Sequence, residues 1–305
     1  MFHILANLDQ EERWLGTTLP EHIQRRLAAM AMLLQALAPE GEPVTIHTSA
    51  VPQDIKPTGL FAPSFDTKPP PRVDLAWCDP AARPFNDRRL SFAIARELGC
   101  ALPRAAVLST LAAIDEHLSR ADGPWVLKAP WSSAGRHRVF GTGPLEGELR
   151  VATERLLALT GELTYEPWCE RICDVAVCGV AGGEVREPHR ILNGPRGNFL
   201  GIELRPNVLE VGEHDQLVTI AERVAQRLFD DGYRGPFGID AFVYSAGGER
   251  RLHPLCEINA RHTFGHVAHA LGQRFGAKGL RFGGIAVPRS ARTLVDTRGI
   301  MAWIV

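Results

Sequence analysis

Residues 235–261 carry the strongest chemical signal in the sequence, because three oxygen-bearing side chains are spaced to meet on one face of a β-hairpin. Two segments with alternating apolar and polar residues are joined by a Gly-Gly turn, the pattern of paired antiparallel strands. Glu257 and Asn259 are two residues apart and point the same way, and the turn puts Asp240 roughly opposite Glu257. Two carboxylates and an amide oxygen, without His or Cys, suit Mg²⁺. A solvated strand face with ordinary acids is the alternative interpretation.

A second chemical signal is Lys128, which ends an apolar segment and precedes a loop of small residues at 131–136. Small residues let backbone N–H groups approach an anion, and the lysine adds a point charge, which is the chemistry of a phosphate clamp. An ordinary turn after a strand is the alternative. The loop is not a Walker A loop, since no Gly-Lys-Ser/Thr follows its glycine. No Gly-x-Gly-x-x-Gly follows the first predicted strand, which disfavours a Rossmann dinucleotide site.

Length and composition limit the classes of protein that fit. A chain of 305 residues is long for one hydrophobic core and suggests two domains. Its formal net charge of −1 gives no reason to expect nucleic acid or an anionic membrane as a partner. We expect no membrane span and no signal peptide, because no run of about 18 apolar residues occurs and the N-terminus lacks a basic region. The six cysteines form no Cys-x-x-Cys pair, and the spacing of Cys169, Cys173 and Cys178 fits no zinc module, so reduced thiols and a cytoplasmic location are expected.

Hydrophobic periodicity predicts a small α/β unit that ends near residue 84, with strands at 2–8, 44–47 and 73–77 and an amphipathic helix at 21–38. Further elements are predicted beyond this unit. The helices are one that begins at 86–87 and stops at Gly99, and others at 109–118, 149–159 and 215–230. The strands are at 105–108, 125–128, 139–140, 163–168 and 200–204, with a hairpin at 174–185 and two short strands in 276–305.

The order of the chemical residues along the chain resembles the ATP-grasp superfamily. The pattern is a basic residue on a helix (Arg88), a strand lysine with a small-residue loop, Glu-Pro-Trp at 166–168, Asp240, and Glu-x-Asn-x-Arg at 257–261. It covers roughly residues 84–269, and the Asp and Glu-x-Asn set is its most specific part. Residues 86–103 look like the "Asp-Lys-Leu … Gly-x-x-Leu-Pro" segment of the peptide-forming ligases in that superfamily.

The resemblance implies a mixed α/β (α+β) chain with the ATP-grasp fold. In this fold two α+β subdomains sandwich ATP, and a small α/β pre-ATP-grasp domain precedes them. The implied domains are 1–84 for the first unit and 85–305 for the ATP-grasp domain. Within the latter, 104–165 would be the central subdomain and 166–305 the metal-binding subdomain.

The resemblance also implies a role for each matching residue. Arg88 and Lys128 would contact the ATP phosphates, under a flap containing Ser132, Ser133 and Gly135. Glu166 would accept from the adenine amino group, and the backbone of Pro167 and Trp168 would face the adenine edge. Asp174 would contact the ribose, with Glu170 as the alternative. Because proline has no N–H, Trp168 would be the main-chain donor. Asp240, Glu257 and Asn259 would bind Mg²⁺. Arg261 would pair with the substrate carboxylate or the phosphoryl group in transfer.

Three features depart from the superfamily pattern. Arg88 stands where a lysine is usual, and with Arg89 beside it the sequence leaves open which arginine faces phosphate. Residues 169–174 offer more than one acid for the ribose. His262, His266 and His269 follow Arg261 at a helical spacing; they are expected to pack or to line the substrate pocket on a helix beginning at Thr263, rather than to bind zinc. His189, Arg190, Arg205 and His262 are candidate contacts to an acidic substrate, and a structural salt bridge is the alternative for His189, Arg190 and Arg205.

These implications lead to an ATP-dependent carboxylate–amine (or carboxylate–thiol) ligase that acts through an acyl phosphate. Its expected catalytic residues are Arg261, Lys128 and Arg88, and its expected cofactors are ATP and Mg²⁺. The alternatives are a small-molecule kinase on the same scaffold and a nucleotide-binding regulatory protein without turnover. The expected partners are small-molecule or peptide carboxylates and amines, with a homodimer left open. The sequence names neither the acid nor the amine.

Overall fold

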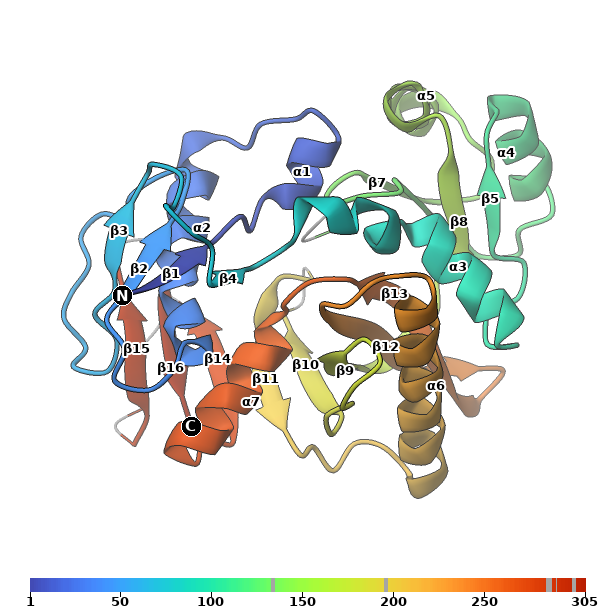
Figure 1. Ribbon diagram of the computed structural model, residues 1–305. Coiled ribbons are helices and arrows are strands. Elements are labelled where there is room, and N and C mark those ends of the chain that lie inside the picture. Colours follow the sequence, from blue (N-terminus) through green and yellow to red (C-terminus); the bar gives the residue numbers. More distant parts are fainter. Residues whose placement is uncertain (133–134, 195–196, 284–286, 289, 298–299) are drawn as a thin grey trace.

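The first strands of the chain form a small parallel sheet. The computed structural model describes residues 1–132, 135–194, 197–283, 287–288, 290–297 and 300–305. Strands β1 (Phe2–Leu5), β2 (Val44–His47), β3 (Ser64–Asp66) and β4 (Leu75–Ala76) lie in the order β3-β2-β1-β4, and all pairs are parallel. Parallel neighbours need a crossover connection. The one between β1 and β2 contains α1 (Gln10–Trp14), α2 (Glu21–Ala31) and the 3₁₀ helix η1 (Met32–Leu37) (Figure 1).

The helix predicted at 21–38 is present as α2 continued by η1. Leu33 and Leu34 are fully buried and share a core with Ile4 and Ile46 of the sheet. Helix α1 and strand β3 were not predicted, because each is too short to show a hydrophobic period.

Residues 106–167 form a second sheet, which is antiparallel. Its strands are β5 (Ala106–Leu108), β6 (Pro124–Lys128), β7 (Arg138–Thr142) and β8 (Leu163–Pro167), in the order β5-β8-β6-β7. Helices α4 (Leu111–Leu118) and α5 (Gly147–Thr160) share a core with this sheet, in which Trp125 and Leu163 are fully buried. The 3₁₀ helix η2 (Pro80–Asn86) and α3 (Arg88–Glu97) connect the first unit to this one, and the Asp87 side chain caps α3 as predicted.

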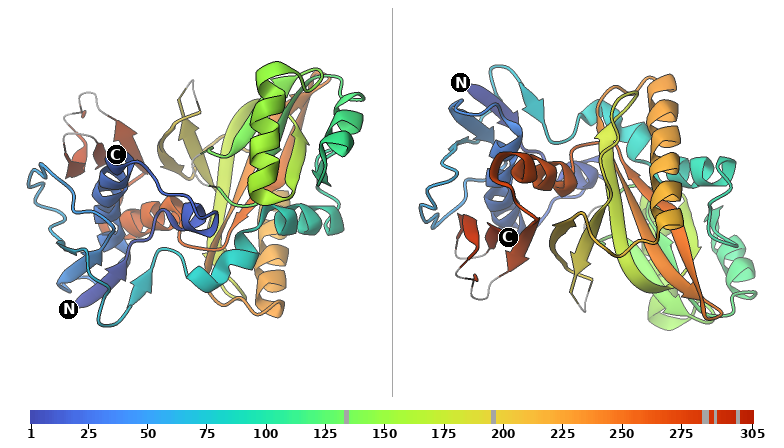
Figure 2. Two further views of the ribbon diagram at one scale, coloured as in Figure 1. Left: turned by 90° about the horizontal axis from the view of Figure 1, so that it is seen from above. Right: turned by 90° about the horizontal axis from the view of Figure 1, so that it is seen from below.

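The third sheet has eight strands in the order β13-β12-β9-β10-β11-β14-β16-β15, with all pairs antiparallel. The strands are β9 (Glu170–Val180), β10 (His189–Asn193), β11 (Phe199–Leu204), β12 (Pro236–Ala246), β13 (Glu249–Asn259), β14 (Gly279–Gly283), β15 (Arg292–Asp296) and β16 (Met301–Ile304), and the helices are α6 (Val211–Asp230) and α7 (Phe264–Phe275). Figure 2 shows α6 running along this sheet. Val177, Ile239 and Ile258 pack in one core with α6. Because side chains alternate along a strand, their neighbours point to the opposite face.

Two predicted features of this sheet are wrong. The hairpin predicted at 174–185 is reduced to one bridge between Gly179 and Val185; β9 instead pairs with β10 and β12, and β10 was not predicted. Residues 276–305 hold three strands among the part that the structure describes, not two. Strands of four or five residues turn only two or three side chains inward, which is too few for a reliable period.

The C-terminal strands and the first unit share one hydrophobic core. Ile4 and Ile46 belong to the same buried cluster as Leu280, Val295 and Ile304. The N-terminal unit therefore packs against strands β14, β15 and β16 of the large sheet. Helix α1 reaches the other end of this sheet, where Glu11 contacts Arg261 just after β13. No helix in the described ranges is long and apolar enough to cross a membrane.

Candidate functional site

The three predicted magnesium ligands lie side by side on one face of the large sheet. Asp240 on β12 is the direct pairing partner of Glu257 on β13, and Asn259 pairs with Gly238. The Asn259 amide donates a hydrogen bond to Asp240 Oδ2 at 3.3 Å. The predicted hairpin register is therefore confirmed, and this acidic face is the one opposite to α6.

Asp240 is in an environment that opposes its negative charge. Burial first, and the neighbouring Glu257 carboxylate second, raise the pKa of Asp240 to about 6. The Arg261 charge and the Asn259 hydrogen bond act in the other direction but do not cancel these two effects. Asp240 therefore holds a proton more tightly than an exposed aspartate does.

Arg88 joins three elements at this face. Its Nη2 donates to Glu257 Oε1 and Oε2 at 2.9 and 3.0 Å, and its Nη1 donates to the Ala129 carbonyl and Ser132 Oγ, both at 2.8 Å. Burial opposes the charge, but Glu257 outweighs it, and the pKa of Arg88 lies above its ordinary value. Arg88 Nε has no hydrogen-bond partner among the described residues.

Arg89 lies elsewhere, which separates the two adjacent arginines. Its guanidinium pairs with Asp87 and with Glu162, and it lies over the Trp131 ring with 5.4 Å from Cζ to the ring centroid. Of the two, only Arg88 reaches the acidic face.

Lys128 extends from β6 toward the acidic face but is held by an acid of its own sheet. Its ammonium forms an ion pair with Glu166 on β8, and its Nζ lies 3.9 Å from Cys256 Sγ on β13. Burial opposes the charge, and Cys256 and Glu166 together outweigh it, so the pKa of Lys128 is raised. Burial raises the pKa of Glu166, but Lys128 more than offsets this and the net pKa is lowered. Glu166, predicted to meet adenine, is thus the partner of the predicted phosphate lysine.

The segment after Glu166 has an arrangement that the sequence did not indicate. The Trp168 N–H donates to the Pro124 carbonyl at 2.9 Å, so this predicted adenine donor is already engaged. The Trp168 ring meets Phe140 edge-on at 4.9 Å, and Arg171 lies over it at 5.3 Å. Arg171 also pairs with Asp174, the predicted ribose contact. Sequence reasoning missed Phe140 and Arg171, since neither belongs to a motif.

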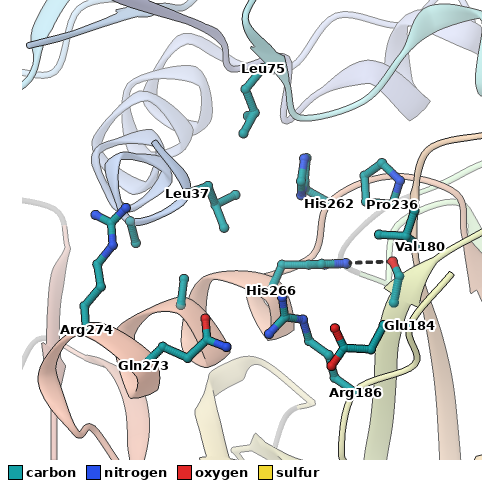
Figure 3. A pocket seen from close by; sticks show the side chains of 13 residues that line it. Leu37, Leu75, Val180, Glu184, Arg186, Pro236, His262, His266, Gln273 and Arg274 are labelled. Carbon is teal, nitrogen blue, oxygen red and sulfur yellow. Dashed lines mark hydrogen bonds between the residues drawn. The ribbon is translucent and has the colours of Figure 1, made fainter. Parts of the chain in front are cut away.

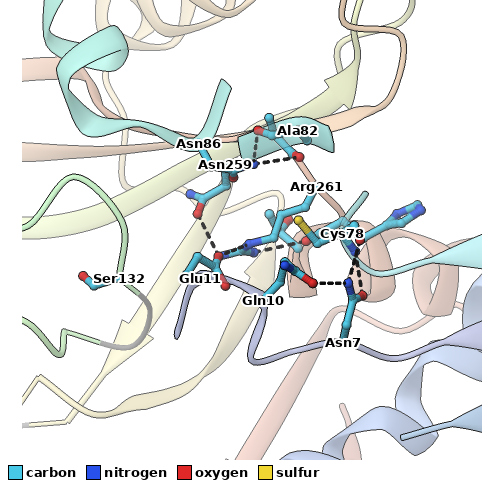
Figure 4. Close-up of polar contacts among 12 residues, drawn as sticks. Asn7, Gln10, Glu11, Cys78, Ala82, Asn86, Ser132, Asn259 and Arg261 are labelled. Atoms are coloured by element: carbon cyan, nitrogen blue, oxygen red, sulfur yellow. Dashed lines mark hydrogen bonds and ion pairs between the residues drawn. The ribbon is translucent and has the colours of Figure 1, made fainter. Parts of the chain in front are cut away.

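Arg261 is held by an acid from the N-terminal unit (Figure 4). Its Nε donates to Glu11 Oε1 at 2.5 Å, and its Nη2 donates to Asn259 Oδ1 at 2.9 Å. Burial opposes its charge, and Glu11 contributes most to overcoming that, so the pKa of Arg261 is raised. The second carboxylate oxygen of Glu11 is buried and has no partner within the described part of the chain.

The loop after Lys128 is fastened to the same short helix α1. Arg136 Nε and His137 Nε2 contact the two oxygens of Glu12, each at 2.6 Å. Burial raises the pKa of Glu12, but the bonds from Arg136 and His137 outweigh it and the net pKa is lowered. Gly135 has φ of +70°, a conformation that suits glycine. Ser133, a predicted flap residue, lies outside the described residues.

The four candidate substrate contacts lie in different surroundings. His189 is buried on the face of Asp240, whereas Arg190 points to the opposite face and pairs with Glu203 at 3.7 Å. Arg205 follows the end of β11 with φ of +51°. His262 lines a cavity of about 340 Å³ between η1, β9 and α7, together with His266 and Arg274 (Figure 3). This cavity contains none of the predicted magnesium ligands in its lining.

The predicted histidine helix is present, but its histidines differ in role. Helix α7 begins after Thr263 as predicted, and His266 caps it by accepting from the Thr263 N–H at 3.0 Å. The other ring nitrogen of His266 bonds the Gly179 carbonyl at 3.2 Å. His269 lies one turn further on, where its ring meets His189 edge-on at 5.5 Å.

Comparison with solved structures shows the fold. The chain aligns with N5-carboxyaminoimidazole ribonucleotide synthetase from Thermus thermophilus at a TM-score of 0.56 and 15% identity, over 100% of this chain and 93% of that one. Phosphoribosylamine–glycine ligase from Thermotoga maritima matches at 0.55 and 13%, over 100% and 90%. The biotin carboxylase domain of the Hydrogenobacter thermophilus 2-oxoglutarate carboxylase, in complex with MgADP, ADP and bicarbonate, matches at 0.52 and 13%, over 72% and 61%.

These neighbours have the ATP-grasp fold, and so does this chain, which confirms the predicted fold class. No protein-family model and no curated protein matches the sequence.

Proposed function

We propose that the chain binds Mg-ATP between its antiparallel four-stranded sheet and its eight-stranded sheet, and uses it to join a carboxylate to an amine or thiol. One observation carries the proposal. Two partly buried carboxylates, Asp240 and Glu257, are paired on one sheet, and Arg88 and Lys128 approach them from the side of the other. Clustered acids with facing cations are an arrangement suited to a divalent ion that bridges phosphates.

The donor set fits magnesium. Asp240 and Glu257 supply hard carboxylate oxygens and Asn259 adds an amide, with no thiol or imidazole among the three. The raised pKa of Asp240, caused by burial and by Glu257, is what a site with too little positive charge produces. Bound Mg²⁺ would supply the neutralising charge for these carboxylates and for the phosphates.

The chain's own cations would position the nucleotide. Arg88 is buried, Lys128 is largely buried, and both are paired to acids, so their side chains are fixed before ligand arrives. Arg88 also holds Ser132 at the start of the small-residue loop, which links the loop to the acidic face. Aligned charges of this kind stabilise phosphoryl transfer without covalent participation by the protein.

The main-chain adenine donor is reassigned in this proposal from Trp168 to Cys169. The Trp168 N–H is bonded to Pro124, while the Cys169 N–H, between β8 and β9, has no acceptor among the described residues. Phe140 and Trp168, about half and one third exposed, would pack against the base.

Arg261 is the residue proposed to meet the acyl substrate. It stands beside Asn259 and is held in place by Glu11, so its guanidinium is oriented at the edge of the acidic face. A carboxylate there would be activated as an acyl phosphate, and an amine would then displace phosphate. The domain division at residue 84, with subdomains 104–165 and 166–305, belongs to the same proposal, although residues 276–305 share their core with the first unit.

The reaction class is tested by ADP release. Purified protein is assayed with Mg-ATP and a panel of carboxylic acids, with and without amines and thiols. A ligase gives ADP, phosphate and a condensed product only when acid and nucleophile are both present. A stable phosphorylated acid formed without amine would identify a kinase instead, and nucleotide binding without turnover across the panel would indicate a regulatory protein.

A further inference from the structure

A largely buried cluster of one cysteine and two histidines lies beneath α7, on the same face of the large sheet as Asp240 but apart from the predicted magnesium ligands. Cys178 on β9, His189 on β10 and His269 on α7 each offer a ligand atom, and these atoms lie within 4.8 Å of one another. Cys178 and His189 are 0% and 2% exposed. Ala176 stands between His189 and Asp240 in the ladder, so the cluster is about two strand spacings, roughly 10 Å, from the predicted magnesium ligands.

The cluster contains polar atoms that its surroundings leave unsatisfied. His189 Nδ1 and His269 Nε2 are buried and have no hydrogen-bond partner in the described ranges. An unpaired buried polar atom destabilises the folded state, and such atoms are rare in folded proteins. His266, on the same helix, shows the contrast, because both of its ring nitrogens have partners. Three elements thus bring two unsatisfied imidazoles and a thiol to one point.

We propose that Cys178, His189 and His269 bind a zinc ion. One thiolate and two imidazoles are the donors that zinc prefers, and they differ in kind from the all-oxygen set of the acidic face. Tetrahedral zinc at ordinary bond lengths needs ligand atoms about 3.3–3.8 Å apart. Ligand atoms that already lie within 4.8 Å reach this by small side-chain rotations. The thiol loses its proton on binding, and a water completes the fourth position.

The ion would fasten α7 to the large sheet. Cys178 and His189 belong to neighbouring strands, and His269 belongs to the helix that follows the Asn259–Arg261 segment. The expected effect is therefore on stability, and it does not depend on the proposed ligase activity.

The test is metal binding by tag-free protein. After treatment with a chelator and dialysis against zinc, metal analysis should find about one zinc per chain, the stoichiometry of a single three-ligand site. Cys178→Ala and His269→Gln should each contain less than about a tenth of this. Two control variants should bind zinc as the wild type does. Cys173→Ala changes a buried cysteine of the same strand that faces the α6 core, and His266→Gln changes a histidine of the same helix.

Cobalt serves as a second probe that does not depend on total metal. Wild-type protein and Cys173→Ala should show the near-ultraviolet thiolate-to-cobalt charge-transfer band, and Cys178→Ala should lack it. Chelator should lower the melting temperature of the wild type and leave that of Cys178→Ala unchanged. A wild type that takes up no zinc, or Cys178→Ala and His269→Gln variants that bind it as the wild type does, would overturn the assignment.

Discussion

The acidic residues of the candidate site and its basic residues are held in place by different kinds of contact. Asp240, Glu257 and Asn259 belong to one hairpin, so their meeting depends on local strand register alone. Arg261 and the loop after Lys128 depend instead on Glu11 and Glu12 of α1, more than a hundred residues away. The comparison indicates that one hairpin brings the proposed magnesium ligands together, whereas α1 of the N-terminal unit holds Arg261 and the loop after Lys128 in place.

The largest expected effect comes from removing that remote support. Glu11→Ala leaves the largely buried Arg261 without its charge partner, and breaking a buried ion pair in this way costs about 3–5 kcal/mol. Urea unfolding measures the loss. Glu21→Ala is the control, because the Glu21–Arg25 pair is exposed and contributes less than about 1 kcal/mol. Equal losses of unfolding free energy in the two variants would show that α1 does not hold Arg261 in place.

The next effect tests the acidic half. Glu257→Gln removes one carboxylate from the proposed magnesium site and should reduce ATP turnover by about 10²–10³, the usual effect of deleting one electrostatic contact in an active site. ADP release is the measurement. Glu203→Gln, the same substitution on β11 of the same sheet, should turn over ATP at the wild-type rate. A Glu257→Gln variant with wild-type turnover would remove Glu257 from the metal site.

The raised pKa of Asp240 should make both stability and magnesium binding depend on pH. Its pKa is raised to about 6 by burial and by Glu257, so the ion-free protein loses stability as pH rises from the unfolded-state pKa, near 4, through 6. Magnesium needs the ionised carboxylate, so the magnesium-dependent part of ATP binding should weaken about fivefold between pH 6 and pH 5, as the ionised fraction of Asp240 falls. Titration calorimetry at several pH values measures this. Magnesium dependence that is flat from pH 7 to 5 would mean that Asp240 does not ligate the ion.

The smallest effect distinguishes the two adjacent arginines. Arg88→Lys keeps the charge but cannot reproduce bonds to Glu257, Ala129 and Ser132 together, and should raise KM for ATP by about tenfold, as expected for loss of a bidentate contact of about 1.5 kcal/mol. Arg89→Lys faces Asp87 and Glu162, which lie away from the acidic face, and should change KM by less than about threefold. Reversed sensitivities would exchange the roles of the two residues.

The sequence predicted what local periodicity controls. The β12–β13 register, the buried stripe of α6 and the start of α7 after Thr263 follow from alternation, from the 3.6-residue period and from capping. The fold class followed from the order of motifs and was confirmed.

The sequence could not supply contacts between distant segments. Helix α1 is five residues long and shows no period, so nothing marked Glu11 and Glu12 as partners of Arg261 and Arg136. The engagement of the Trp168 N–H by Pro124 depends on how β6 and β8 are aligned. The cluster of Cys178, His189 and His269 needed β10, which the periodicity did not reveal.

The most direct test is calorimetric binding of a non-hydrolysable ATP analogue with and without Mg²⁺, to wild-type protein and to Asp240→Asn. We expect magnesium to strengthen binding by at least about tenfold in the wild type, the gain expected when a cation bridges carboxylates and phosphates, and by less than twofold in the variant. The same magnesium dependence in both proteins, or no nucleotide binding by the wild type, would contradict the assignment of Asp240 and Glu257 to a magnesium–nucleotide site.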